Sequence, residues 1–157
     1  MRSRPRLLVR AFVVSMLLVF PVSAEAPAGQ YAPFIGQDRR IEDVKTGLIW
    51  ERSVTPAPVE FDVAQTSCTG GTRLPTLKEL LTLVDEEPHD DYDLTKNRVV
   101  EKFIDEQAFG DETPIDKGYW TSSMQSANRA WTIDFATGET FAEGLDGKFY
   151  VRCVRRK

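Results

Sequence analysis

The densest group of residues that could do chemistry is a run of acids in the middle of the chain. Its members lie within nine positions: Asp85, Glu86, Glu87, Asp90, Asp91 and Asp93. Calcium takes six to eight oxygen ligands of this kind. The run lacks the alternating ligand spacing and the glycine of an EF-hand loop, so a charged, solvated loop is the competing interpretation. The residues that we predict for a ligand or calcium loop, if calcium binds, are Asp85, Glu86, Asp90, Asp91 and Asp93.

Catalysis is not indicated by the residues available for it. His89, in the acidic run, is the one histidine of the chain. Ser-His-Asp and Cys-His arrangements need a histidine base, and nothing near His89 in the sequence indicates an organised site. A glycosidase needs two carboxyl groups held about 5 to 9 Å apart, and the sequence places no pair in that way. We therefore expect no enzyme activity, no catalytic residue and no histidine-rich zinc site.

The first 24 residues have the pattern of a secretory signal peptide. A basic head with Arg2, Arg4 and Arg6 precedes an apolar run over residues 11–20, and small residues lead up to Ala24. The apolar run is far shorter than the roughly 20 residues that a membrane span needs. We predict cleavage after Ala24 and a secreted or periplasmic mature chain without membrane insertion. An uncleaved anchor is the alternative.

The charge of the chain limits its partners. The net charge is −4, and residues 1–24 hold four arginines and no acid, so their removal leaves −8. So acidic a domain is a poor general partner for nucleic acid or an anionic membrane. Cations nevertheless cluster near the C-terminal end of the sequence, at Arg152, Arg155, Arg156 and Lys157. These are interpreted either as a solvated tail or as a local anion-binding patch.

Cys68 and Cys153, the two cysteines of the chain, are predicted to form one structural disulfide. Disulfides persist in the oxidising compartments that exported chains reach. The bond would close a loop over most of the mature domain, worth about 4 to 5 kcal/mol in the chain-entropy model. Neither cysteine has a neighbouring histidine or a CxxC partner that would indicate redox or metal chemistry.

Two helices are predicted to follow one another. Phe61, Ala64 and Cys68 recur at helical spacing and predict a first helix over residues 59–67. A second helix is predicted over residues 76–85, where Thr76 and Glu79 have the spacing of a capping box. Gly70 and Gly71 precede it and allow backbone angles closed to other residues. One face of the second helix is apolar, through Leu77, Leu80, Leu81 and Val84.

Strands are predicted on both sides of these helices. They cover residues 40–43, 48–51, 119–122, 131–135, 140–142 and 148–155. Residues 25–37 are predicted to be a linker or an irregular strand. Residues 86–118 are predicted to be mainly loop, with a short helix within 99–107, and so long a loop is often functional. Trp50, Trp120 and Trp131 lie in strand patterns, which favours core positions over sugar-stacking platforms.

Several motifs of the chain resemble, in order, those of the Lcl C-terminal domain family, named for the C-terminal domain of a collagen-like bacterial adhesin. The resemblance covers residues from about 27 to the C-terminus. The shared residues are Asp43, Thr46-Gly47-Leu48-Ile49-Trp50, Phe61, Ala64, Cys68, Gly71, Arg73-Leu74-Pro75-Thr76, Glu79-Leu80, Leu83-Val84-Asp85, Tyr119-Trp120-Thr121-Ser122-Ser123, Ala130-Trp131 and Tyr150-Val151-Arg152-Cys153-Val154-Arg155. The family usually has tryptophan at the positions of Phe61 and Thr72, and residues 86–117 match poorly.

The resemblance implies a fold and a domain layout. The expected fold is α+β and C-type lectin-like, with two helices, a small antiparallel sheet, a long loop region and one disulfide, over residues 38–157. The Arg73-Leu74-Pro75-Thr76 string also resembles the helix start of the formylglycine-generating enzymes. Those enzymes need a pair of reactive, copper-binding cysteines, whereas both cysteines here are expected in the structural bridge.

The expected function is therefore that of an exported, non-enzymatic, lectin-like binding module. Its partner would be a glycan or a cell-envelope component, contacted through the loop region over residues 86–117. The family's adhesin implies sulfated polysaccharide, but a net charge of −8 favours a neutral glycan, a protein or calcium-bridged binding. The alternative is a structural or scaffolding envelope domain that binds another protein and no small ligand. The sequence does not determine an oligomeric state.

Overall fold

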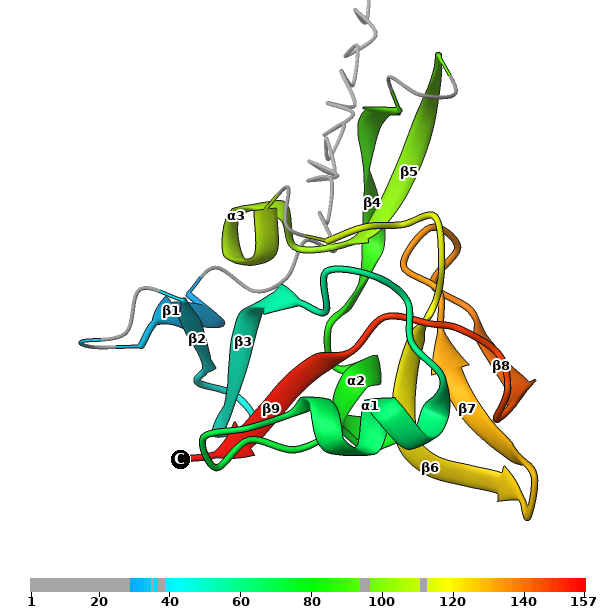
Figure 1. The fold of residues 1–157 in the computed structure, drawn as a ribbon. Coiled ribbons are helices and arrows are strands. Elements are labelled where there is room, and N and C mark those ends of the chain that lie inside the picture. The colour runs from blue at the N-terminus through cyan, green and yellow to red at the C-terminus, as the bar shows by residue number, and fades with distance from the viewer. Residues whose placement is uncertain (1–28, 35, 37–38, 94–96, 111–112) are drawn as a thin grey trace, which may run out of the picture.

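The computed structural model describes residues 29–34, 36, 39–93, 97–110 and 113–157. Residues 1–24, the predicted signal peptide, lie outside the described residues. In the described part of the chain, the strands form three antiparallel sheets, with short helices between them (Figure 1). No helix among the described residues is both long enough and apolar enough to cross a membrane.

The first sheet is built from both ends of the domain. Its strands are β1 (Tyr31–Pro33), β2 (Arg40–Asp43), β3 (Leu48–Val54) and β9 (Arg152–Arg156), in that order. The turn between β2 and β3 is held by Asp43, whose carboxylate accepts from the Lys45 and Thr46 N–H groups and from the Thr46 hydroxyl. Gly47 closes this turn at φ 69°, a conformation in which glycine avoids the strain of a Cβ.

The helices are shorter than the sequence predicts. The first helix is confirmed as α1 (Phe61–Ser67), and the second as α2 (Leu77–Leu81), which ends well before residue 85. A third, α3 (Glu106–Phe109), is a single turn. The capping box of α2 is confirmed, because Thr76 Oγ1 accepts from the Glu79 N–H and the Glu79 carboxylate accepts from the Thr76 N–H.

The third sheet contains β6 (Tyr119–Ser126), β7 (Arg129–Ile133) and β8 (Thr140–Gly144), and α1 and α2 pack against it. Trp120 on β6 is fully buried, with its ring edge-on to Phe61 and Phe149 at centroid distances of 5.2 and 4.8 Å. Its indole N–H donates to Val59 O. The core prediction is confirmed for Trp50 and Trp120, which are 0% exposed, whereas Trp131 is half-buried.

The predicted long loop is wrong. Strands β4 (Val84–Asp93) and β5 (Arg98–Ile104) pair as an antiparallel hairpin, which projects from the rest of the domain (Figure 1). The helix predicted within residues 99–107 is also wrong over Arg98–Ile104. Acids and Pro88 disfavour a strand when β4 is considered alone. The partner strand β5 does have a strand preference, because it contains the β-branched Val99, Val100 and Ile104. Ile104 is buried in the core, and pairing with β5 therefore holds β4 in the extended conformation.

The expected C-type lectin-like α+β fold is therefore wrong as well. Most of the regular structure is strand, divided among three small sheets, and the three helices of the described residues are seven, five and four residues long. Helices this short do not make a helical layer: α1 and α2 pack locally against the third sheet, and α3 packs against β3. The predicted disulfide is confirmed, since Cys68 and Cys153 are bonded with their Cα atoms 5.6 Å apart.

Loss of this disulfide is expected to be costly, because it joins residues 85 positions apart. The Cys68→Ser, Cys153→Ser double variant should lose about 4 to 5 kcal/mol of unfolding free energy in the chain-entropy model. Urea unfolding, followed by tryptophan fluorescence, measures this difference. Adding reductant should destabilise the native chain and leave the double variant unchanged; equal stability of the two chains would contradict the expectation.

Candidate functional site

An ion pair between Arg73 and Glu79 holds the segment that leads into α2. The Arg73 guanidinium donates to both Glu79 carboxylate oxygens, at 2.8 and 2.6 Å, in a bidentate pair. The same carboxylate accepts from the Thr76 N–H at 2.9 Å. These hydrogen bonds, with that from Arg73 foremost, lower the pKa of Glu79 to about 2 and raise that of Arg73. Glu79 therefore stays a carboxylate throughout the neutral range.

Strand β6 holds the same segment from the other side. Ser122 donates to Pro75 O through both its N–H and its hydroxyl, at 2.7 and 3.1 Å. Ser123 Oγ accepts from the Leu77 N–H at 2.9 Å. The Thr-Ser-Ser string of β6 and the Arg-Leu-Pro-Thr string before α2 thus bind each other, and their role is structural.

Strand β9 carries the C-terminal cations to this segment. Arg73 and Val154 exchange backbone hydrogen bonds of 2.8 and 3.0 Å, so Arg73 lies beside β9. On the other side β9 pairs with β3, with Arg155 opposite Ile49 and Arg156 opposite Leu48. Arg152, Arg155 and Arg156 belong to a strand of the first sheet rather than to a tail, and the interpretation as solvated residues is wrong for Arg152 alone. Arg152 is fully buried, and Arg156 is exposed.

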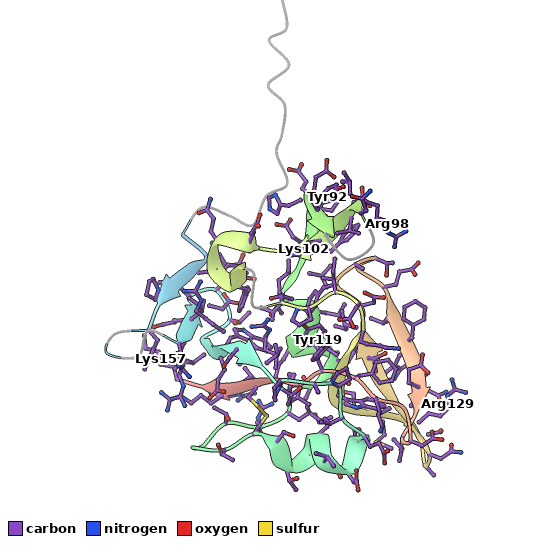
Figure 2. All side chains as sticks on the ribbon, turned by 45° about the horizontal axis from the view of Figure 1, so that its top comes forward. Tyr92, Arg98, Lys102, Tyr119, Arg129 and Lys157 are labelled. Carbon is purple, nitrogen blue, oxygen red and sulfur yellow. A yellow bond between two sulfur atoms is a disulfide. The ribbon has the colours of Figure 1, made fainter. Side chains whose placement is uncertain are left out.

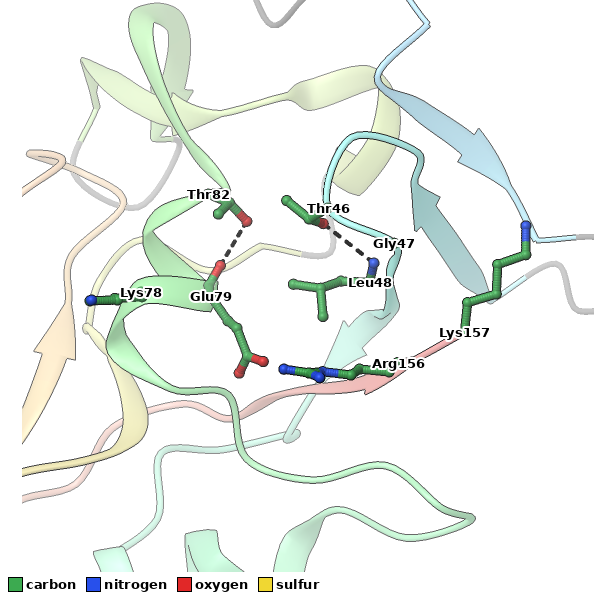
Figure 3. A pocket seen from close by; sticks show the side chains of 8 residues that line it. All are labelled: Thr46, Gly47, Leu48, Lys78, Glu79, Thr82, Arg156 and Lys157. Carbon is green, nitrogen blue, oxygen red and sulfur yellow. Dashed lines mark hydrogen bonds between the residues drawn. The ribbon is translucent and has the colours of Figure 1, made fainter.

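Two hollows in the described part of the chain share Arg156 as a lining residue, and Figure 3 shows the first of them. The first, of about 540 Å³, lies between the β2–β3 turn, α2 and the end of β9. The second, of about 570 Å³, is lined by Gly71, Arg73, Arg155 and Arg156. Together they form what we call the cationic groove, whose charged lining residues are Arg73, Lys78, Glu79, Arg155, Arg156 and Lys157.

The cations of the groove differ in how they are compensated. Arg73 is paired with Glu79, and Lys157 Nζ is 2.6 Å from Glu42 Oε1. Arg155 lies over the ring of Phe34, 5.3 Å from its centroid. Lys78 and Arg156 form no ion pair within the described part of the chain. The groove therefore holds uncompensated positive charge on a chain whose net charge is −4.

The acids predicted for a ligand or calcium loop lie along β4. Asp85 is buried and accepts from the Glu87 N–H, whereas Glu86 and Asp90 are exposed. The side chains of Asp91 and Asp93 lie outside the described residues. The described residues contain no group of three or more candidate metal ligands, and calcium binding stays a prediction.

His89 lies on β4 rather than in a loop. Its Nε2 is 3.8 Å from Asp85 Oδ2, and its Cα partner on β5 is Lys102. A histidine beside a carboxylate supplies the base and the acid of a catalytic triad, and the triad also needs a nucleophile. Both cysteines of the chain are bonded in the disulfide and cannot serve as that nucleophile. Serine is absent from β4 and β5.

Among the cations of the groove, Arg73 and Lys78 are the two that sequence reasoning assigns to no site. The sequence holds two indications of an anion site here. The C-terminal cations are a candidate anion-binding patch, and Arg73 belongs to the Arg-Leu-Pro-Thr motif that the chain shares with the family. What the sequence could not show is that residues 73 and 155 lie side by side. The pairing of Arg73 with Val154 decides that.

These features define the class of protein: a small, β-rich, disulfide-bonded domain with a cationic groove beside its last strand. The family model of the Lcl C-terminal domain matches residues 39–155, and the chain belongs to that family. A search of curated proteins gave no match to this chain.

The Glu79 carboxylate gives a pH-dependent contribution to stability. A carboxylate with a lowered folded-state pKa stabilises the fold above its unfolded pKa, and this stabilisation is lost as the pH falls toward the folded pKa. Glu79→Gln should therefore lower the melting temperature at pH 7, and the difference from the native chain should shrink between about pH 4.5 and the folded pKa of about 2. Thermal unfolding at several pH values measures it.

Glu139→Gln is the matched control, since Glu139 is exposed at the turn before β8. It should leave the melting temperature nearly unchanged at each pH. A difference between Glu79→Gln and the native chain that does not change with pH would contradict the role of the carboxylate charge.

Proposed function

We propose that this domain is an exported, non-enzymatic binding module that recognises acidic groups on a cell-surface or envelope glycan through the cationic groove. The observation that carries the proposal is the position of Arg156. It lines both hollows and has no carboxylate partner in the described part of the chain. A guanidinium so placed offers its fork of N–H donors to a carboxylate, sulfate or phosphate.

The groove reconciles an acidic chain with an anionic ligand. The net negative charge repels a polyanion over most of the surface, but this repulsion is screened beyond about 10 Å at 0.1 M salt. At the groove, Lys78, Arg155 and Arg156 present cations on adjoining elements, so the local field attracts acidic groups. The structure thus favours an acidic glycan over the neutral one that the net charge alone indicates.

The lining of the groove supports binding rather than catalysis. Glu79 is its one carboxylate among the described residues, and Arg73 holds the pKa of that group far below neutral. A general acid or base works best with a pKa near the operating pH, so Glu79 is unsuited to proton transfer. Its role is to orient Arg73 and to start α2.

The place of action follows from the disulfide and the predicted signal peptide. Cys68–Cys153 joins distant parts of the domain, and such bonds persist outside the reducing cytosol. We propose the periplasm or the exterior as the place of action. A scaffolding role on another envelope protein is the second candidate, because the same arginines can donate hydrogen bonds to the aspartate and glutamate side chains of a protein partner.

Arg156→Gln tests the groove directly. Losing one charge-assisted contact should weaken binding of dextran sulfate about ten- to a hundredfold, since such contacts contribute about 1.5 to 3 kcal/mol. Titration calorimetry of the mature chain, with neutral dextran and polyglutamate as further probes, measures the loss and the ligand class. Tighter binding of polyglutamate than of dextran sulfate would favour the protein-docking role.

Arg98→Gln is the matched control for charge, because Arg98 is exposed on the hairpin, away from β9 (Figure 2). It should leave the affinity for dextran sulfate unchanged. Equal losses in both variants would mean non-specific electrostatics, and binding of neutral dextran alone would overturn the proposal.

A glycan array run with and without calcium separates the groove from the acids of β4. Acidic glycans should be retained equally in both conditions, because the groove presents cations of its own. If glycans are retained only when calcium is present, the carboxylates of β4, and not the cationic groove, would be the binding site.

A further inference from the structure

The β4–β5 hairpin has a free edge that is suited to another strand. In the described part of the chain β5 pairs with β4 alone, as a two-stranded sheet. At its base the hairpin contacts the segment that follows β7, through Phe103 and Phe135, and beyond that point it projects from the rest of the domain (Figure 1). An exposed strand edge offers a row of N–H and C=O groups to any strand that can meet it.

The outward backbone groups of β5 can be identified. Phe103 donates its N–H to Phe135 O at 2.8 Å, away from β4. Because the direction of the N–H alternates along a strand, the N–H groups of Glu101 and Val99 also point to the free edge. Because the Phe103 N–H is already used, the outward N–H groups open to another strand are those of Val99 and Glu101.

The same position is apolar on one face of the hairpin. Val99 is 60% exposed, and its Cα partner Tyr92 is 49% exposed. They are directly opposite one another, so their side chains lie on one face and form a short exposed row. Hydrophobic side chains in this arrangement gain from a further apolar neighbour across the free edge of β5.

The edge of β4 is unsuited to such pairing. It contains Pro88, a register shift between Val84 and His89, and the run of acids that would oppose one another across a second β4. Prolines, bulges and charges are the features that protect strand edges. Over Arg98–Ile104 the sequence has no proline, and its pairing with β4 is regular from Arg98 to Lys102.

We propose that β5 pairs antiparallel with β5 of a second copy of this chain, about a two-fold axis at Val99. The pairing makes a four-stranded sheet in the order β4-β5-β5-β4. A residue whose N–H points to the free edge must pair with a residue of the second copy whose N–H also points to that edge. For Val99, two registers satisfy this condition, one with Val99 opposite Val99 and one with Val99 opposite Glu101.

The charges select between these registers. With Val99 opposite Val99 of the second copy, Arg98 faces Val100, and the apolar row extends without a break across all four strands. With Val99 opposite Glu101, Arg98 would face Lys102 of the second copy, and like charges directly opposite are destabilising. The two-fold register at Val99 therefore complements itself, as the same patch on both partners must in a symmetric dimer.

The contact is limited to one short strand from each copy. It buries less than the roughly 1,200 Å² of a stable interface, so the dimer should form only as the concentration rises. Multi-angle light scattering of the mature chain should show the mean mass rising from one chain toward two. Val99→Lys should keep the mass of one chain, and Val63→Lys, at an exposed valine of α1 that is 48% exposed, should behave as the native chain.

Cross-linking tests the register. A hydrogen-bonded antiparallel pair has its Cα atoms about 5.5 Å apart, within the range that a disulfide spans. Val99→Cys should therefore form a covalent dimer on mild oxidation, seen on a non-reducing gel. Glu101→Cys should not, because its counterpart lies four residues away along the strand, about 13 Å, and Val63→Cys should not either.

Any other pattern of cross-linking among these three variants overturns the proposed register. A native chain that keeps the mass of one chain at every concentration overturns the dimer itself. Neither result bears on the cationic groove, because β9 and α2 lie outside the hairpin.

Discussion

Strand β9 is held on both of its edges and through one of its side chains, and most of the structure depends on that. One edge pairs with β3, and the other exchanges two backbone hydrogen bonds with Arg73 through Val154. Between these contacts, Cys153 is bonded to Cys68 at the end of α1. The C-terminal strand therefore joins the first sheet to both larger helices, and it carries Arg155 and Arg156 to the place where the groove forms.

Arg152 shows what this central position requires. Its side chain is fully buried, and its guanidinium donates to Glu51 O, Arg52 O and Thr113 Oγ1. The ring of Phe109 lies 4.8 Å from the guanidinium carbon. A buried charge is costly unless polar groups or aromatic faces compensate it, and here two carbonyl groups, a hydroxyl and a ring meet the two terminal nitrogens and the face of the guanidinium, whereas its Nε has no hydrogen-bond partner among the described residues. Arg152 thus ties α3, after the hairpin, to the first sheet, whereas Arg156 on the same strand is exposed.

Local sequence signals predicted the parts of the fold that depend on neighbours in the chain. Thr76 and Glu79 were identified as a capping box because both groups act within one turn. The bond between Cys68 and Cys153 was predicted because the chain has no other cysteine. The hairpin was missed because the acids of β4 have poor strand preference, and the preference of β5 acts on them only through pairing. The C-type lectin-like layout failed for a related reason, since the number and length of helices depend on where strands begin.

The family, the disulfide, the helix starts, the acidic character and the cluster of cations at residues 152–157 can all be read from the sequence. Each of these depends on residue type, on spacing within a turn or on a count. The folded chain is needed to see that Arg152 is buried while Arg156 is exposed, and that Arg73 and Lys78 line one groove with the C-terminal cations. Those outcomes come from backbone pairing between β9 and residues about 80 and 100 positions earlier, which no local pattern specifies.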